Sequence, residues 1–213
     1  MNISELIDHT ILTPDCSPAD INRVCSEAME HKFKAVCIPP YYVKTAANLL
    51  QDSFVKVATV IGYPMGYSAT ASKVEEIKRA LDEGADEVDV MINLCAIKSN
   101  NWNYIANDID TVTTAVHIKG KAVKIILETG MLSEDEIKRL CELCNKSKPD
   151  FVKTSTGLLG PGASTDAVQL LKGNLTDGIQ IKASGGIRTH EQAREFVQLG
   201  ATRIGSSSGV SLL

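Results

Sequence analysis

The stretch Phe151-Val152-Lys153-Thr154-Ser155-Thr156-Gly157 shows the pattern around which the rest of the chain is organised. Its apolar and β-branched residues predict a short strand that runs out into glycine. The nearest acidic residue in the sequence is Asp150, so the central lysine has no obvious local counter-ion. Burial would favour its neutral amine, which is a nucleophile toward carbonyl groups. The alternative is a strand-end lysine that reaches solvent, because lysine is rarely fully buried.

A second stretch, Gln180-Ile181-Lys182-Ala183-Ser184-Gly185-Gly186, repeats this design. Apolar strands followed by a turn and a helix recur along the whole chain. Besides the two lysine-bearing stretches, strands are predicted at residues 8–12, 34–38, 55–61, 87–92, 123–128 and 203–205. Helices are predicted at about residues 3–7, 18–31, 41–50, 72–83, 102–118, 134–145, 165–171 and 189–199, with a very short one near the C-terminus.

Eight strands, each followed by a helix, indicate an α/β fold: a single (β/α)₈ TIM barrel over residues 1–213. It is expected to have a short N-terminal helix and a truncated C-terminal helix. The strand at 55–61 is apolar on both faces, which is typical of parallel sheets covered by helices. The runner-up, a doubly wound open sheet, would show a glycine-rich fingerprint after its first strand, and none follows Leu12.

Composition narrows the class of ligand. The formal net charge is −4, and no run of Lys or Arg is present, which argues against a nucleic-acid or membrane-surface partner and favours a small molecule. We expect a cytoplasmic protein, because no segment approaches the ~20 apolar residues of a membrane span and the start lacks a signal-peptide pattern. The six cysteines are expected to be reduced, including the Cys141–Cys144 pair within a helical stretch.

In a barrel, inward-pointing strand residues gather below the mouth at the carboxyl ends of the strands. The polar residues at such positions are Asp8, Cys37, Asp89, Lys124, Lys153 and Lys182. Each alone could be a core polar residue satisfied by a neighbour. Three lysines in one barrel are harder to explain in that way, because repulsion between ammonium groups lowers at least one lysine pKa from its usual ~10.4. The sequence therefore predicts a neutral, reactive amine.

Glycine-rich turns follow the last three predicted strands, at residues 156–157, 185–188 and 205–209. Glycines let backbone N–H groups approach an oxyanion, and barrels often hold phosphate in the loops after their last two strands. Such turns also occur without any ligand. Their arrangement around one lysine predicts an anion site.

These residues resemble a known family. The matching stretches are Asp8-His9-Thr10, Asp86-Glu87-Val88-Asp89-Val90, Lys153-Thr154-Ser155-Thr156-Gly157 and Lys182-Ala183-Ser184-Gly185-Gly186. In this order, and over nearly the whole chain, they closely resemble the deoxyribose-phosphate aldolase family. One departure is Leu158, where some relatives carry a lysine. Another is that many relatives continue past the final short helix into a tail that can carry a tyrosine, whereas this chain stops at Leu213.

The resemblance implies a class I aldolase that cleaves 2-deoxy-D-ribose 5-phosphate to D-glyceraldehyde 3-phosphate and acetaldehyde, without a metal or other cofactor. Lys153 would form the Schiff base, Lys182 would depress its pKa, and Asp89 would transfer protons through a water. Supporting residues would be Asp8, Lys124 and Cys37, and the phosphate would lie against Gly157, Gly185, Gly186, Arg188, Gly205, Ser207 and Ser208.

Other functions remain open at this point. The chain could be another phosphate-binding barrel aldolase or isomerase, or a barrel that binds a phosphorylated metabolite without catalysis. The presence of both Lys153 and Lys182 argues against a mere binding protein, which would have no use for a depressed lysine pKa. Barrels of this kind often pair through their outer helices, so a homodimer is an expectation.

Overall fold

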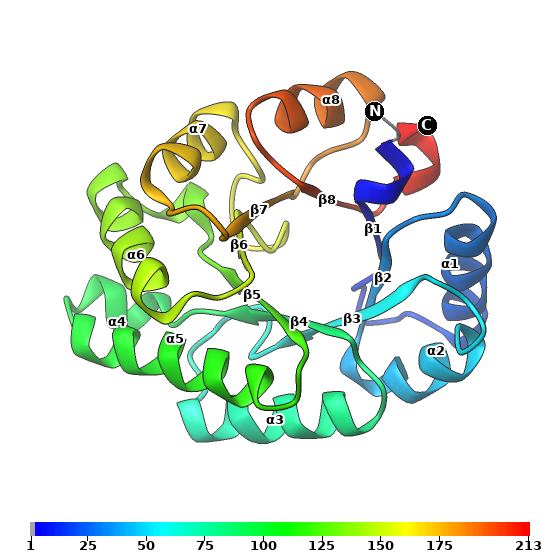
Figure 1. Cartoon of the computed structure of the whole chain (residues 1–213), viewed down its shortest axis with the longest axis horizontal. Helices are drawn as coiled ribbons and strands as arrows, with labels where there is room; N and C mark the ends of the chain where they lie inside the picture. Colours follow the sequence, from blue (N-terminus) through cyan, green and yellow to red (C-terminus); the bar gives the residue numbers. More distant parts are fainter. Residues whose placement is uncertain (1–2) are drawn as a thin grey trace.

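The apolar segments form a closed barrel in the computed structural model, which describes residues 3–213 (Figure 1). Residues 1–2 of the predicted domain lie outside this range. Eight parallel strands pair in chain order, and β8 closes the barrel against β1. The strands are β1 Ile7–Thr10, β2 Ala35–Ile38, β3 Lys56–Ile61, β4 Glu87–Met91, β5 Ala122–Ile126, β6 Phe151–Lys153, β7 Gln180–Ser184 and β8 Arg203–Ser206.

Helices surround this ring, as the predicted TIM barrel requires (Figure 1). They are α1 Pro18–Glu30, α2 Val43–Leu49, α3 Thr70–Asp82, α4 Leu94–Lys98, α5 Trp102–His117, α6 Glu134–Ser147, α7 Thr165–Asn174 and α8 His190–Gln198. Short 3₁₀ helices occur at η1 Ile3–Leu6, η2 Pro40–Tyr42, η3 Thr129–Met131 and η4 Gly209–Leu212. Capping boxes at Ser17, Ser133 and Thr189 start α1, α6 and α8.

Three local details differ from the sequence prediction. The first strand ends at Thr10 and not at residue 12, because Ile11 to Thr13 already form the loop that leads to α1. Helix α4 was not predicted, since its five residues are too few to establish a helical period; Asn93 caps it by accepting a hydrogen bond from the Ala96 N–H. The segment after β8 is a 3₁₀ helix.

The main apolar core lies between the strands and the helices, whereas Ala35, Cys37, Ala58 and Val60 form a small apolar cluster of their own. Strand register aligns the charged residues in neighbouring strands: Asp89 is opposite Lys124, and Lys153 is opposite Lys182. Because side chains alternate along a strand, residues in such rows share the inner face. The fold therefore brings these charges together.

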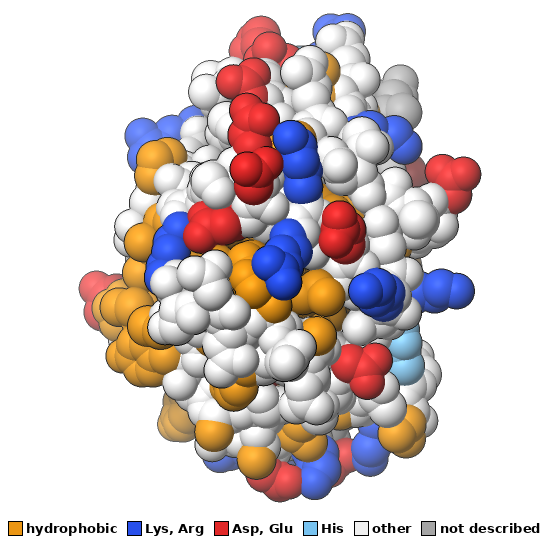
Figure 2. Space-filling view, turned by 90° about the vertical axis from the view of Figure 1, so that its left-hand side faces the viewer, with side chains coloured by type: hydrophobic (Ala, Val, Ile, Leu, Met, Phe, Trp, Pro, Cys, Tyr) orange, Lys and Arg blue, Asp and Glu red, His pale blue; other side chains and the backbone are white. Residues whose placement is uncertain are grey.

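The outer surface carries charges of both signs. On the face at the left of Figure 1, acidic and basic side chains are intermixed around a patch of apolar ones (Figure 2). Within residues 3–213, no helix is long and apolar enough to cross a membrane.

Candidate active site

A cluster of seven ionisable side chains fills the inside of the barrel. Its members, Asp8, Glu87, Asp89, Lys124, Lys153, Lys182 and Arg203, are all buried. A buried charge is costly unless it is paired and hydrogen-bonded. The contacts within the cluster therefore decide which of these groups stay charged.

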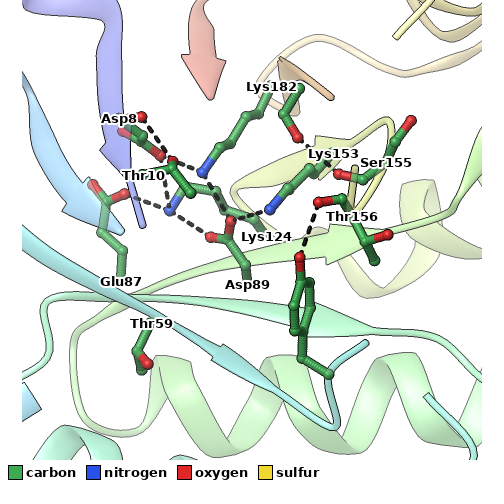
Figure 3. Close-up of polar contacts among 12 residues, drawn as sticks. Asp8, Thr10, Thr59, Glu87, Asp89, Lys124, Lys153, Ser155, Thr156 and Lys182 are labelled. Atoms are coloured by element: carbon green, nitrogen blue, oxygen red, sulfur yellow. Dashed lines mark hydrogen bonds and ion pairs between the residues drawn. The ribbon is translucent and has the colours of Figure 1, made fainter. Parts of the chain in front are cut away.

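Asp89 is the centre of the cluster (Figure 3). Its Oδ1 lies 2.9 Å from Lys124 Nζ, and its Oδ2 accepts hydrogen bonds from Lys153 Nζ at 2.9 Å and Lys182 Nζ at 2.8 Å. Burial opposes ionisation of this carboxyl, but the three ammonium groups prevail and hold the pKa of Asp89 well below its usual range. Asp89 is thus an ionised carboxylate shared by three lysines.

Asp8 anchors the second lysine from the other side. Its Oδ2 lies 2.5 Å from Lys182 Nζ, and its Oδ1 accepts from Arg203 Nη1 at 2.6 Å. Burial lowers the tendency of Lys182 to be charged, but Asp8 and Asp89 outweigh it and raise the pKa of Lys182. Burial alone would raise the pKa of Asp8, but three nearby cations lower it. Arg203 has the largest effect of the three, followed by Lys182 and Lys124. Lys182 therefore remains an ammonium group.

Glu87 and Arg203 complete the network, and sequence reasoning missed both. Glu87 lies 2.5 Å from Lys124 Nζ and accepts from Arg203 Nη1 at 2.8 Å. A signal for Glu87 was available, because it lies two residues before Asp89 and so faces the same side of β4. Arg203 is the first residue of β8. At the start of a strand, the alternation of side chains does not show whether an arginine points into the barrel or reaches solvent.

The sequence premise that Lys153 lacks a counter-ion is wrong. Its partner is Asp89, which lies 64 residues earlier in the chain. The pairing of β4 with β5 places Asp89 opposite Lys124, so that the carboxylate of Asp89 lies within reach of Lys153 inside the barrel. The lysine is buried, as expected, with 2% of its surface exposed. It differs from Lys124 and Lys182 in having one carboxylate contact, whereas each of those has at least two.

A cavity of about 440 Å³ opens above this cluster at the carboxyl ends of the strands. Within residues 3–213, Lys153 is the one member of the cluster that lines it. The remaining wall comes mostly from the loops after β1, β6, β7 and β8, and it includes the predicted anion-site residues Gly157, Gly185, Gly186, Arg188, Gly205 and Ser207. The cavity thus has a lysine amine among glycine-rich turns.

Several backbone groups in these turns are free to bind a ligand. Within residues 3–213, the N–H groups of Gly157, Gly185, Gly186 and Ser207 donate no hydrogen bond. Gly157 and Gly185 have φ angles of 82° and 96°, and a Cβ at Gly185 would lie 2.8 Å from Gly162 Cα, so this close approach requires glycine. Free N–H groups in glycine turns form concave sites for anions.

Two further predicted residues, Ser208 and Cys37, belong neither to the charged cluster nor to the cavity wall. The Ser208 N–H donates to Ser206 Oγ at 3.0 Å, and Ser206, not Ser208, lines the cavity. Cys37 is buried in the small apolar cluster with Ala35 and Ala58, and burial raises its thiol pKa. The cavity also contains Tyr63, from the loop after β3, which sequence reasoning did not include.

The fold and the site define a class: a (β/α)₈ barrel enzyme with a buried lysine–carboxylate cluster beneath a cavity at the carboxyl ends of its strands. Comparison with known proteins narrows the class. A family model described as DeoC/LacD family aldolase matches residues 3–213. The chain therefore belongs to this aldolase family, and it is an enzyme of the lyase class.

Full-length relatives agree with this assignment. The chain is 46% identical over 213 residues to the deoxyribose-phosphate aldolase of Desulfitobacterium hafniense, with 100% of this chain and 98% of the relative covered. It is also 46% identical to the deoxyribose-phosphate aldolase of Thermococcus kodakarensis, with 99% and 95% covered. The solved structure of the Aeropyrum pernix deoxyribose phosphate aldolase, described as a unique tetramer, matches with a TM-score of 0.92 at 30% identity, covering 99% of this chain and 88% of that one.

Proposed function

We propose that this enzyme reversibly cleaves 2-deoxy-D-ribose 5-phosphate to D-glyceraldehyde 3-phosphate and acetaldehyde through a Schiff base on Lys153. One observation carries the proposal. Of the buried lysines in the cluster, Lys153 is the one that lines the cavity, while Lys124 and Lys182 lie beneath it. Its amine can therefore reach a bound carbonyl, and the relatives named above supply the reaction and the substrate.

Charge balance within the cluster supports Lys153 as the nucleophile. Four cations face three carboxylates, which leaves one net positive charge when all are ionised. Loss of one proton makes the cluster neutral, which favours burial. Lys153 has the fewest carboxylate contacts, so its deprotonation breaks the least ion pairing. A neutral amine at this position can attack a carbonyl carbon.

The reaction then balances as follows. The Lys153 amine adds to the aldehyde carbon of the open-chain sugar, and the resulting carbinolamine takes up a proton and loses water to give an iminium ion. Removal of the proton from the 3-hydroxyl breaks the bond between C2 and C3, releases the phosphorylated aldehyde, and leaves an enamine on the lysine. Protonation of the enamine and addition of water release acetaldehyde and restore the amine. Asp89, an ionised carboxylate that contacts Lys153, would relay these protons through a water.

The phosphate would bind at the glycine-rich wall of the cavity. The free N–H groups of Gly157, Gly185, Gly186 and Ser207 would face it, and the Arg188 side chain would add positive charge. Gly205 would allow close approach along β8, while Ser208 remains a weaker prediction because its N–H is already used. The association of two copies also stays a prediction.

Reduction with borohydride in the presence of acetaldehyde tests the proposal. The expected product is the protein with one ethyl group on Lys153, located by mass spectrometry of peptides. A Lys153→Met variant should lose both the adduct and the aldolase activity, whereas Lys119→Met, at an exposed site, should keep both. An adduct confined to another lysine would move the nucleophile. Turnover of the sugar phosphate without any trapped imine would indicate an isomerase or another mechanism.

A further inference from the structure

The backbone of Thr156, at the rim of the cavity, is held from both sides by side chains distant in the sequence. Tyr63 donates its hydroxyl hydrogen to the Thr156 carbonyl oxygen at 2.9 Å. Glu128 Oε2 accepts a hydrogen bond from the Thr156 N–H at 2.8 Å. The two side chains come from the loops after β3 and β5, while Thr156 follows β6. Three loops are thereby joined at one residue, close to Ser155 and Lys153 (Figure 3).

These bonds fix two consecutive peptide planes. A peptide unit is planar, so the direction of its carbonyl determines the direction of the N–H on its other side. Tyr63 holds the carbonyl of the Thr156–Gly157 unit and thereby orients the Gly157 N–H, one of the free donors at the cavity. The preceding unit is fixed likewise, because Ser184 Oγ donates to its Ser155 carbonyl at 2.7 Å while Glu128 holds its N–H.

Glu128 occupies an energetically costly position, and Tyr63 lies at the cavity. Glu128 is fully buried at φ 58°, in the left-handed region that non-glycine residues rarely adopt, and its Oε1 has no hydrogen-bond partner within the described chain. Tyr63 lines the cavity that contains Lys153 and also a larger one of about 850 Å³, so it lies where the two meet. Burial is the main cause that raises the pKa of Tyr63, which keeps the hydroxyl a donor.

We propose that Tyr63 and Glu128 are positioning residues that orient the Thr156–Gly157 peptide for the phosphate of the substrate. The inference rests on the proposed function and adds two residues that do not themselves touch the phosphate. Since the Gly157 N–H contacts the anion and not the reacting carbons, loss of either clamp weakens binding of a phosphorylated substrate. Chemistry at Lys153 changes little.

Two isosteric variants test this role. Tyr63→Phe removes the hydroxyl that holds the Thr156 carbonyl, and Glu128→Gln replaces one of the two carboxyl oxygens by an NH2 group that cannot accept from the Thr156 N–H. With 2-deoxyribose 5-phosphate, each variant should raise KM about tenfold, equivalent to about 1.4 kcal/mol, with kcat within about threefold of wild type. With unphosphorylated 2-deoxyribose, both KM and kcat should stay within about twofold.

Tyr42→Phe is the matched control. Tyr42 also donates its hydroxyl hydrogen to a backbone carbonyl, that of Cys16 at 3.0 Å, and it lines the larger cavity but not the one that contains Lys153. It should leave KM unchanged with both substrates. Thermal melting of each variant checks that the fold is intact, and direct titration with inorganic phosphate supplies a readout independent of turnover.

The outcomes separate this inference from the proposed function. A rise in KM for the phosphorylated sugar alone, with weaker binding of inorganic phosphate by the Tyr63 and Glu128 variants, supports the clamp. Equal changes with both sugars, a fall in kcat at constant KM, or no change beyond that of Tyr42→Phe overturns it while the aldolase function stands. If the wild-type protein cleaves neither sugar, the proposed function fails. The phosphate titration then tests the clamp alone, and equal affinities in wild type and variants overturn it.

Discussion

Lys153 and Lys182 donate hydrogen bonds to the same carboxylate oxygen, Asp89 Oδ2, at 2.9 and 2.8 Å. The two lysines are nevertheless unequal. Lys182 is fully buried and contacts a second carboxylate, that of Asp8. Lys153 contacts no carboxylate other than Asp89 within the described residues, and it lines the cavity. One carboxylate oxygen thus joins a lysine that is held by two carboxylates to a lysine that lines the cavity.

Lys182→Met should shift the pH dependence of activity. With all groups ionised, the cluster carries one net positive charge, and removal of Lys182 reduces this to zero, so protonated Lys153 is no longer opposed. A shift of about two pH units would lower activity at neutral pH about a hundredfold, with recovery as the pH rises. The profile of kcat/KM against pH measures the shift.

Lys153→Met is the control for that experiment, because it lacks the proposed nucleophile and should show no recovery at any pH. A Lys182→Met enzyme that is equally inactive throughout the range, or fully active at neutral pH, would contradict the electrostatic role. Lys182 would then act in proton transfer, in phosphate binding or only in the structure.

Asp8→Asn should reduce the dependence of stability on pH in acid. The pKa of Asp8 is lowered in the folded protein, so as the pH falls the unfolded chain takes up this proton first, near its ordinary pKa of about 3.9. The carboxylate therefore contributes stability above about pH 4, and this contribution is lost as the pH falls toward the folded-state pKa. Urea unfolding at several pH values from about 3 to 7 should give a flatter curve for the variant.

The variant should also be less stable at neutral pH, by about 3 kcal/mol or more, because Lys182 and Arg203 lose a buried partner. Asp110→Asn, at an exposed position on α5, provides the comparison and should follow the wild-type curve. Parallel curves for Asp8→Asn and wild type would contradict the prediction, because they would show that the pKa of Asp8 is the same in the folded and the unfolded protein.

A buried ion pair outside the cluster, Lys73 with Asp108, does not line the cavity and should matter for stability. Lys73 Nζ donates to Asp108 Oδ2 at 2.7 Å between α3 and α5, and Thr70 Oγ1 donates to the other carboxylate oxygen at 2.7 Å. Lys73→Met leaves the carboxylate buried without its cation, which should lower the free energy of unfolding by about 3–5 kcal/mol. Denaturant unfolding measures this loss.

The double variant Lys73→Met/Asp108→Leu removes both charges and should recover most of that stability, because replacing a buried ion pair by apolar residues is often neutral. Its kcat and KM should equal those of wild type. A double variant as unstable as the single one would show that Lys73 contributes through packing and not through charge.

Local sequence pattern was sufficient for the barrel and for the convergence of Asp89, Lys124, Lys153 and Lys182, because alternation along strands places such residues on one face. It could not identify partners. The carboxylate of Lys153 lies 64 residues earlier, and the hydroxyl that holds Thr156 lies 93 residues earlier. These pairings depend on strand register and loop path, which single-sequence patterns do not specify.

Ser208 illustrates the same limit on a smaller scale. Its sequence, in a run of three serines before a glycine, gives no means of choosing which residues face the cavity. The structure decides this through one hydrogen bond, in which Ser206 Oγ accepts from the Ser208 N–H. A backbone N–H that donates to a nearby side chain is not available to a ligand. The amino-acid sequence alone does not show which N–H groups are used in this way.

The ion pair between Asp8 and Arg203 joins the first strand to the last, across 195 residues of chain. A barrel without β8 would leave Asp8 and Glu87 each short of one cation partner, because Arg203 contacts both carboxylates. Incomplete chains are thereby disfavoured, and the final strand completes the sheet and the charge balance in one step.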